Sequence, residues 1–259
     1  MPFANLPDVK IHYDLAGPAD APVVVFSNGL GTTLQMWEPQ VAPFSKHFRV
    51  LRSDTRGHGQ SQYTPGPYSI EKLSWDVIAL LDSLKVDRAH FCGLSMGGMI
   101  GMFLGTHAPN RFHKLVLSNT AAKIGTNESW NTRIQNVQSG GMKSVCTAVF
   151  ERWLTAAYCS AHPAEAQSVL AMLESANTDG YIACCAALRD ADFRTDIGNI
   201  RLPCLAVAGT QDQTSTPADL QFLANTIPGA SYVELPAAHV SNIEAHEAFN
   251  RHVLQFLTA

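Results

Sequence analysis

The sequence predicts an α/β fold in which a mostly parallel central sheet is flanked by helices and interrupted by a helical insert. Two observations lead to this fold class. Short apolar segments alternate with helix-like segments in the first half of the chain, and the alternation resumes near its end. Between these parts the pattern is helical only. We therefore expect residues 1–120 and 200–259 to form the α/β core, and residues 121–199 to form a helical cap over the carboxyl ends of the strands.

The first half of the chain supplies most of the predicted sheet. Its strand segments are short and apolar or β-branched, as strands buried on both faces are. They are expected at 9–15, 22–28, 48–54, 89–94 and 113–119. Helices are expected at 69–84, where apolar side chains recur at helical spacing, and at 96–106. This order predicts parallel βαβ units with right-handed crossovers.

The rest of the chain divides into the insert and a return to strands. No strand is expected between 130 and 192, so the insert should be built of helices alone. Strands are then expected at 202–210 and 230–235, with a helix from 218 between them. One closing helix is expected at 243–257.

Composition excludes several classes of function. The 259 residues are 46% hydrophobic and 15% charged, which is typical of a globular protein with a sizeable core. The net charge is −4 and no run of Lys or Arg occurs, so neither nucleic acid nor a membrane is expected as a partner. The first ten residues lack the pattern of a secretory signal, and a cytoplasmic location is expected. The oligomeric state is left open, a homo-oligomer included.

Motifs for metals and cofactors are missing from the sequence. It has no H-E-x-x-H, no Cys/His cluster and no G-x-G-x-x-G, so neither a metal nor a nucleotide cofactor is expected. The six cysteines show no C-x-x-C spacing and are expected to be reduced, buried thiols.

The segment Gly93-Leu94-Ser95-Met96-Gly97 matches G-x-S-x-G at the junction of a predicted strand and a predicted helix. At such a junction the serine occupies a strained corner, and the flanking glycines let the two backbones pass. The motif predicts Ser95 as a nucleophile at the N-terminus of a helix. The alternative is a tight glycine-lined contact with an idle serine.

A serine hydroxyl needs a base and an orienting carboxylate to become a nucleophile. His239 is the expected base, since it lies in a loop that follows a predicted strand. Asp212 directly follows the strand before that one and is the expected acid, although an Asx-turn would also explain it. Asp219 suits the start of a helix better. The order serine, aspartate, histidine is that of the α/β-hydrolase fold.

Two backbone N–H groups are expected to form an oxyanion hole. One belongs to Met96, directly after the serine. The other belongs to Leu30 in S-N-G-L-G-T (27–32), where a simple glycine-rich turn is the alternative. The segment D-T-R-G-H-G-Q-S (54–61) is expected to brace the adjacent turn.

Longer motifs resemble a known family over nearly the whole chain. The matching segments are S-N-G-L-G-T, R-S-D-T-R-G-H-G-Q-S, G-L-S-M-G-G, N-T-A-A-K-I-G, W-N-T-R, G-Y-I-A-C-C-A-A-L-R-D-A-D-F-R and A-A-H-V-S-N-I-E. Together they resemble the 3-oxoadipate enol-lactonases, α/β hydrolases of the β-ketoadipate pathway of bacterial aromatic catabolism. The family often has serine where this chain has Gly29, and tyrosine where it has Ser53.

The resemblance implies hydrolysis of a small enol-lactone that carries a free carboxylate, without a cofactor. A carboxylate in an apolar pocket favours an arginine partner. Arg133 follows Trp130 by about one helical turn, so both are expected to face the substrate, and Trp153 is a second expected wall. A solvated arginine and an ordinary core tryptophan are the alternatives.

Other functions fit the same triad. A carboxylesterase, a perhydrolase or a carbon–carbon bond hydrolase would differ only in the pocket. A non-catalytic small-molecule receptor on this scaffold is a rival of a different class.

Overall fold

An eight-stranded sheet forms the centre of the protein, with the order β1-β2-β4-β3-β5-β6-β7-β8. The computed structural model describes residues 1–259. The strands are β1 (Phe3–Asn5), β2 (Lys10–Ala16), β3 (Val23–Ser27), β4 (Arg49–Ser53), β5 (Ala89–Leu94), β6 (Phe112–Ser118), β7 (Cys204–Gly209) and β8 (Ser231–Leu235). From β4 to β8 neighbouring strands are parallel, while β2 pairs antiparallel with both β1 and β4.

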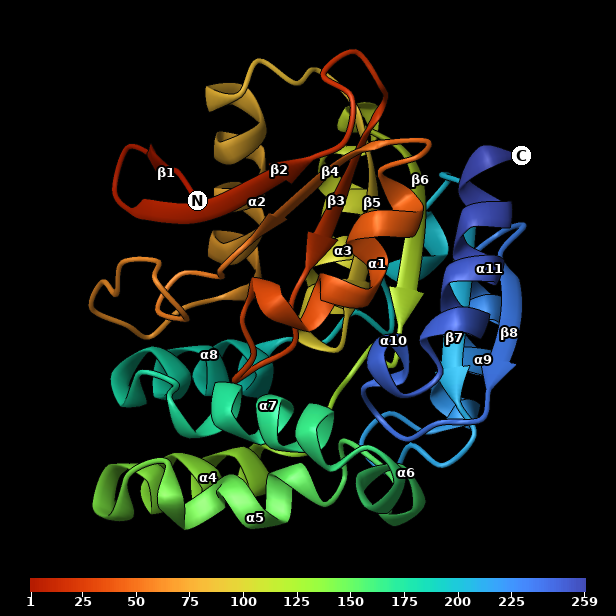
Figure 1. The fold of residues 1–259 in the computed structure, drawn as a ribbon. Coiled ribbons are helices and arrows are strands. Elements are labelled where there is room, and N and C mark those ends of the chain that lie inside the picture. The colour runs from red at the N-terminus through yellow and green to blue at the C-terminus, as the bar shows by residue number, and fades with distance from the viewer.

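Helices cover both faces of the sheet and one of its ends. They are η1 (Leu34–Trp37), α1 (Glu38–Phe44), α2 (Ile70–Ser83), α3 (Met96–His107), η2 (Pro109–Arg111), α4 (Asn127–Gly140), α5 (Lys143–Phe150), α6 (Ala156–Ala161), α7 (Pro163–Glu174), α8 (Thr178–Asp190), η3 (Ile197–Asn199), α9 (Pro217–Thr226), α10 (Ser241–Glu244) and α11 (His246–Thr258). Helix α3 packs on β5 and β6 beside α2, and α1 packs beside α11. Helices α4 to α8 gather beyond the carboxyl ends of β3 and β6 (Figure 1).

This architecture confirms the predicted fold class. Each predicted strand is present within two residues of its expected bounds, and the insert contains helices only. The boundaries of core and cap at residues 120 and 200 stay predictions.

Three elements differ from the sequence prediction. The single closing helix expected at 243–257 is wrong, because the chain bends at Ala245 (φ −118°, ψ 41°) and divides into α10 and α11. The Asn242 side chain in α10 donates to the Met36 carbonyl oxygen (2.8 Å), a tertiary contact that helical periodicity does not reveal. Strand β1 and helix α1 were not expected. They are short, and α1 holds two prolines within seven residues.

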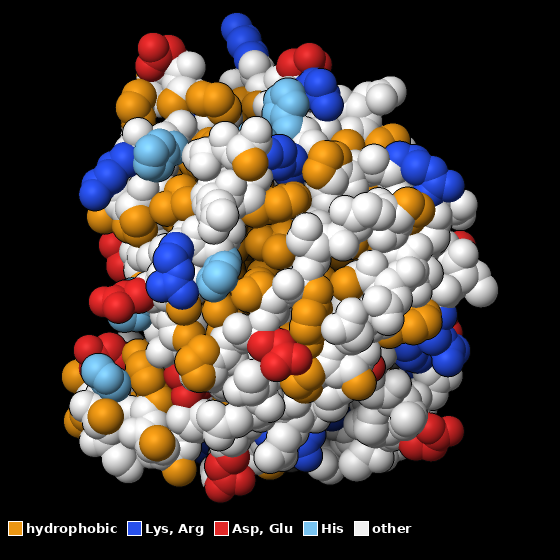
Figure 2. All heavy atoms as spheres, turned by 90° about the vertical axis from the view of Figure 1, so that its right-hand side faces the viewer, with side chains coloured by type: hydrophobic (Ala, Val, Ile, Leu, Met, Phe, Trp, Pro, Cys, Tyr) orange, Lys and Arg blue, Asp and Glu red, His pale blue; other side chains and the backbone are white.

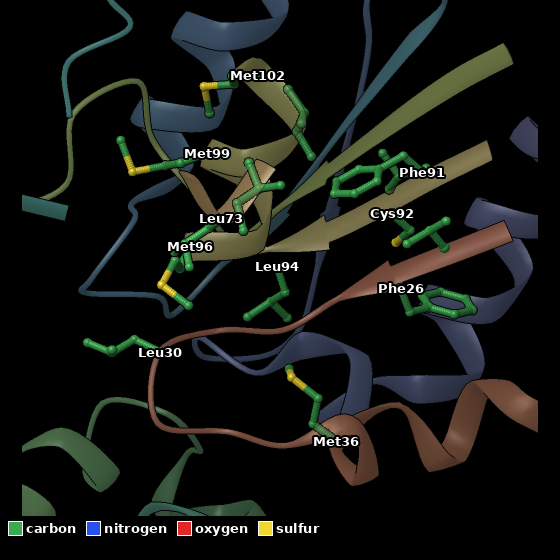
Figure 3. Packing of buried hydrophobic residues seen from close by; sticks show 14 of the residues in the cluster. Phe26, Leu30, Met36, Leu73, Phe91, Cys92, Leu94, Met96, Met99 and Met102 are labelled. Carbon is green, nitrogen blue, oxygen red and sulfur yellow. The ribbon is translucent and has the colours of Figure 1, made fainter. Parts of the chain in front are cut away.

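The buried core lies on both faces of the central strands. Every residue of β3 and β5 is buried, because helices pack above and below them. Figure 3 shows Met99 and Met102 of α3 on one side of these strands, and Phe26 and Met36 on the other. The Phe26 ring lies 4.7 Å from the Trp37 ring, centroid to centroid. This packing holds the carboxyl end of β3 in place.

The outer surface has mixed charge. On the face that carries α9 and α11, basic and acidic side chains are interspersed around an apolar centre (Figure 2). All six cysteines are free. Five of them are buried, as expected, whereas Cys159 is only half-buried. None of the helices is long and apolar enough to span a membrane.

Helix α3 approaches the end of β3 unusually closely. A Cβ atom on Gly97 would lie 2.2 Å from the Ser27 carbonyl oxygen, far inside the contact distance. Only glycine fits there, and the approach brings the start of α3 beside the loop that follows β3.

We therefore expect Gly97→Ala to lower the free energy of unfolding by about 3 kcal/mol or more, since the new methyl group meets rigid backbone. Urea unfolding measures this loss. The control is Gly198→Ala, whose nearest neighbours would be 3.9 Å away and which should leave stability unchanged or slightly raised. Equal stability of the two variants would contradict the close approach.

Candidate active site

Ser95 lies at the corner where β5 ends and α3 begins. Its backbone has φ 58° and ψ −114°, a conformation that residues other than glycine rarely adopt. A Cβ atom on Gly93 would lie 2.1 Å from the Gly97 carbonyl oxygen, so both glycines are needed for the sharp turn. The corner presents the serine at the N-terminus of α3, with 7% of the residue exposed.

His239 and Asp212 come from the loops that follow β8 and β7. The His239 Nδ1 atom lies 2.8 Å from Asp212 Oδ2. Both residues are buried, yet His239 lines the same cavity as Ser95. The ring nitrogen Nε2 makes no hydrogen bond with a protein group, the Ser95 hydroxyl included. The structure thus brings three predicted residues to one end of the sheet.

The Asp212 carboxylate is fixed by several donors. Its Oδ1 atom accepts the backbone N–H groups of Thr214 (2.7 Å) and Ser215 (3.0 Å). Burial by itself raises the pKa of Asp212, but His239 and the hydrogen bonds from Ser215 and Asn119 outweigh it and lower the pKa below its ordinary value of 3.8. The carboxylate is therefore ionised at neutral pH, where it can orient the imidazole.

Asn119 is a buried residue of the site that the sequence did not reveal as functional. Its Nδ2 atom donates to Asp212 Oδ2 (3.1 Å) and to the Ala238 carbonyl oxygen (3.2 Å). Its backbone has φ 45°, a region that asparagine tolerates better than most residues. Asn119 thus links the end of β6 by hydrogen bonds to Asp212 and to the loop that carries His239.

A second tie joins the histidine loop to the insert. The Val240 N–H donates to the Trp153 carbonyl oxygen (2.9 Å). The Glu244 carboxylate accepts the Ala238 N–H (2.8 Å) and also binds the Thr155 hydroxyl. The position of Trp153 is therefore set by the same loop that carries His239.

The loop after β3 carries Leu30 and is held from behind by His58. The Gly31 N–H donates to His58 Nε2 (3.0 Å). Burial lowers the pKa of His58, so its ring stays neutral and Nε2 remains an acceptor. This is the bracing expected of residues 54–61. The N–H groups of Leu30 and Met96 have no protein acceptor, which leaves both free for a ligand.

A single cavity connects these groups. It is partly open to solvent. Six of the residues predicted for the site line it, namely Leu30, Ser95, Trp130, Arg133, Trp153 and His239. Of the other two, Asp212 lies behind the histidine, and Met96 is buried beside the serine with its side chain packed in the core (Figure 3).

The basic side chains in the cavity wall are those of Arg133, Arg152 and His239. Arg133 is half-buried, and its guanidinium carbon lies 4.7 Å from the centre of the Trp130 ring. Arg152 is exposed at the same cavity and was not predicted. No ion pair of the protein involves either arginine, and no Asp or Glu lines the cavity. The wall is therefore suited to an anionic ligand.

Two further observations concern the wall. Trp130 is fixed by a hydrogen bond from Nε1 to the Ile124 carbonyl oxygen (2.7 Å).

A Cβ atom on Gly29 would lie 3.6 Å from Ser95 Cβ, an ordinary contact. A serine, which the resembling family often has, would fit at Gly29 without strain.

Comparison with known proteins agrees with this geometry. Residues 22–140 match the family model described as the alpha/beta hydrolase fold. The chain is 42% identical to 3-oxoadipate enol-lactonase 2 of Acinetobacter baylyi, over 95% of this chain and 92% of that protein. The chain belongs to the 3-oxoadipate enol-lactonase family.

Solved structures lead to the same family. The enol-lactonase from Burkholderia xenovorans superposes with a TM-score of 0.98 and 45% identity, over 100% of both chains. 3-Oxoadipate enol-lactonase 1 of Acinetobacter baylyi is 38% identical over 95% of this chain and 92% of its own length. The protein is therefore a carboxylic ester hydrolase with the α/β-hydrolase fold, as the sequence predicted.

The low pKa of Asp212 makes stability depend on pH. A carboxyl whose pKa is lower in the folded than in the unfolded state adds stability above the unfolded value of 3.8, and that contribution is lost as the pH falls through the folded value. We expect Asp212→Asn to flatten the acid limb of Tm against pH between about pH 5 and pH 2.

Thermal unfolding across this pH range measures the effect. Asp20→Asn is the matched control, because Asp20 is exposed and lies in no ion pair of the protein. If Asp212→Asn and the wild type lost stability in parallel as the pH fell, the lowered pKa would be contradicted.

Proposed function

We propose that this chain hydrolyses 3-oxoadipate enol-lactone to 3-oxoadipate through an acyl-enzyme on Ser95. The observation that carries the proposal is one cavity that combines the Ser95 and His239 side chains with two unpaired arginines and no acid. The substrates named for the relatives at 42% and 38% identity support the same reaction.

In the first step the Ser95 hydroxyl attacks the lactone carbonyl carbon. His239 Nε2 takes the serine proton, while Asp212 on Nδ1 holds the ring and stabilises the imidazolium. The carbonyl oxygen becomes an oxyanion that the free N–H groups of Leu30 and Met96 bind. The positive end of α3 adds to that stabilisation.

Collapse of the intermediate opens the ring. The ring oxygen leaves as an enol, receives the proton from His239, and the enol tautomerises to a ketone. Water then attacks the acyl-enzyme with His239 as base, and Ser95 is restored. The product carries two carboxylates.

The substrate carboxylate would lie against Arg133. The guanidinium is held over the Trp130 ring and has no acidic partner, so its donors are free for a charge-assisted pair. Trp153, also in the cavity wall, would close the pocket against the ring of the lactone. The remaining residues of the wall are mostly apolar and would contact the lactone ring.

We expect Ser95→Ala to fold like the wild type and to lose at least about 10,000-fold in kcat, as loss of a triad nucleophile does. Lactone opening followed by ultraviolet absorbance measures kcat, and circular dichroism checks the fold. Retention of more than a tenth of the wild-type rate would contradict a covalent role for this serine.

We expect Arg133→Ala to lower kcat/KM for the carboxylate-bearing lactone by about 10- to 100-fold, because one charge-assisted pair is lost. Hydrolysis of neutral p-nitrophenyl acetate should change little. Arg189→Ala is the matched control, since Arg189 is paired with Asp190 (2.7 Å) and lies outside this cavity. An equal loss on both substrates would show that Arg133 does not bind the carboxylate. If the wild type hydrolysed neutral esters faster than the lactone, a carboxylesterase would be favoured instead.

A further inference from the structure

Tyr181 of α8 has a buried hydroxyl without a partner. The residue is 0% exposed, and its hydroxyl oxygen makes no hydrogen bond with any protein group. Buried polar groups are almost always paired, so an unpaired one calls for an explanation. Tyr181 lines the same cavity as Ser95 and Arg133. A ligand in that cavity can therefore supply the missing partner.

The Tyr181 ring is held between the oxyanion loop and the insert. A Cβ atom on Gly31 would lie 3.1 Å from Tyr181 Cε2 and 2.6 Å from Leu173 Cδ1, so the loop packs directly on the ring. Figure 1 shows this loop, after β3, reaching down to α8. The ring cannot swing away without displacing Leu30, the next residue of the loop. The hydroxyl is thus fixed in place before a ligand arrives.

The hydroxyl is a donor next to a cation. Burial raises the pKa of Tyr181, and the nearby Arg133 charge opposes only part of the rise. The phenol keeps its proton at neutral pH. Arg133 lies close enough to oppose that rise by its charge and as a neighbouring hydrogen-bond donor. No protein group accepts the hydroxyl proton, so the phenol is a free donor next to a cation.

We propose that Tyr181 is a specificity-determining residue whose hydroxyl donates a hydrogen bond to the substrate carboxylate, beside the guanidinium of Arg133. A carboxylate has two oxygens and accepts from both donors at once. The lactone carbonyl oxygen would accept hydrogen bonds from the N–H groups of Leu30 and Met96, so it needs no further donor. This inference rests on the proposed function, since it assigns a second contact to the same substrate.

The test is Tyr181→Phe, which removes the hydroxyl and keeps the ring that packs on Gly31. We expect kcat/KM for the carboxylate-bearing lactone to fall by about 10- to 100-fold, as for a lost hydrogen bond to a charged group. Hydrolysis of p-nitrophenyl acetate should stay within about twofold of the wild type. The Tm should equal or exceed that of the wild type, because no internal hydrogen bond is lost.

Tyr68→Phe is the matched control, for which we expect the opposite effects on stability and on substrate preference. Tyr68 is also buried, but its hydroxyl donates to the Thr64 carbonyl oxygen (2.6 Å) away from the cavity. This variant should lower Tm and leave the preference for the charged lactone unchanged.

A binding experiment separates the inference from the reaction. Ser95→Ala protein, with and without Tyr181→Phe, is titrated with adipate, a dicarboxylate probe, by calorimetry. The added change should weaken binding by about tenfold or more. Combined with Arg133→Ala, its effect should be less than additive, because both residues hold one carboxylate.

Three results would overturn the inference. Unchanged kcat/KM and unchanged adipate binding would mean that the hydroxyl meets only water. Equal losses on the lactone and on p-nitrophenyl acetate would place the hydroxyl at the reacting bond instead. If the losses of adipate binding caused by Tyr181→Phe and Arg133→Ala were additive, the two side chains would not bind the same carboxylate. If the wild type failed to open the lactone, the proposed function would fall, while adipate binding would still decide the role of Tyr181.

Discussion

The strained corner at Ser95 is the constraint on which the site depends. Residues other than glycine avoid its backbone angles of φ 58° and ψ −114°, and the conformation persists because β5, α3 and β3 pack around it. The contact between Gly97 and the Ser27 carbonyl fixes the distance from α3 to β3, and hence from Ser95 to the loop of Leu30. Neutral His58 fixes that loop from the other side. Nucleophile and oxyanion donors are therefore positioned by backbone packing, before any substrate is present.

The acid and base depend on a second set of contacts. Asp212 is held by backbone N–H groups and by Asn119, and His239 by its bond to Asp212. Strands β6, β7 and β8 end side by side in the sheet, so the loops after them meet at one rim. The insert joins this rim through Trp153, whose carbonyl accepts the Val240 N–H. Pocket wall and catalytic rim thus form one hydrogen-bonded unit.

The sequence predicted those site residues whose positions follow from the order of the strands. Ser95, Asp212 and His239 each follow a strand, and parallel strands bring their carboxyl ends together, so their approach could be foreseen. Arg133 and Trp130 were foreseen from helical spacing and a family resemblance. Tyr181 and Arg152 were missed because helical periodicity marks them as core and surface residues, and only the packing of α8 and of the segment after α5 brings them to the cavity. The bend at Ala245 was missed for the same reason, since it depends on a contact with Met36.

Trapping of an acyl-enzyme would identify the nucleophile without relying on a substitution. The protein is mixed with the enol-lactone, quenched in acid during turnover, digested, and analysed by mass spectrometry. We expect a single adduct of the mass of the opened lactone, on the peptide that contains Ser95. An adduct on another residue, or steady turnover with Ser95 never modified under conditions that trap such esters, would contradict this expectation.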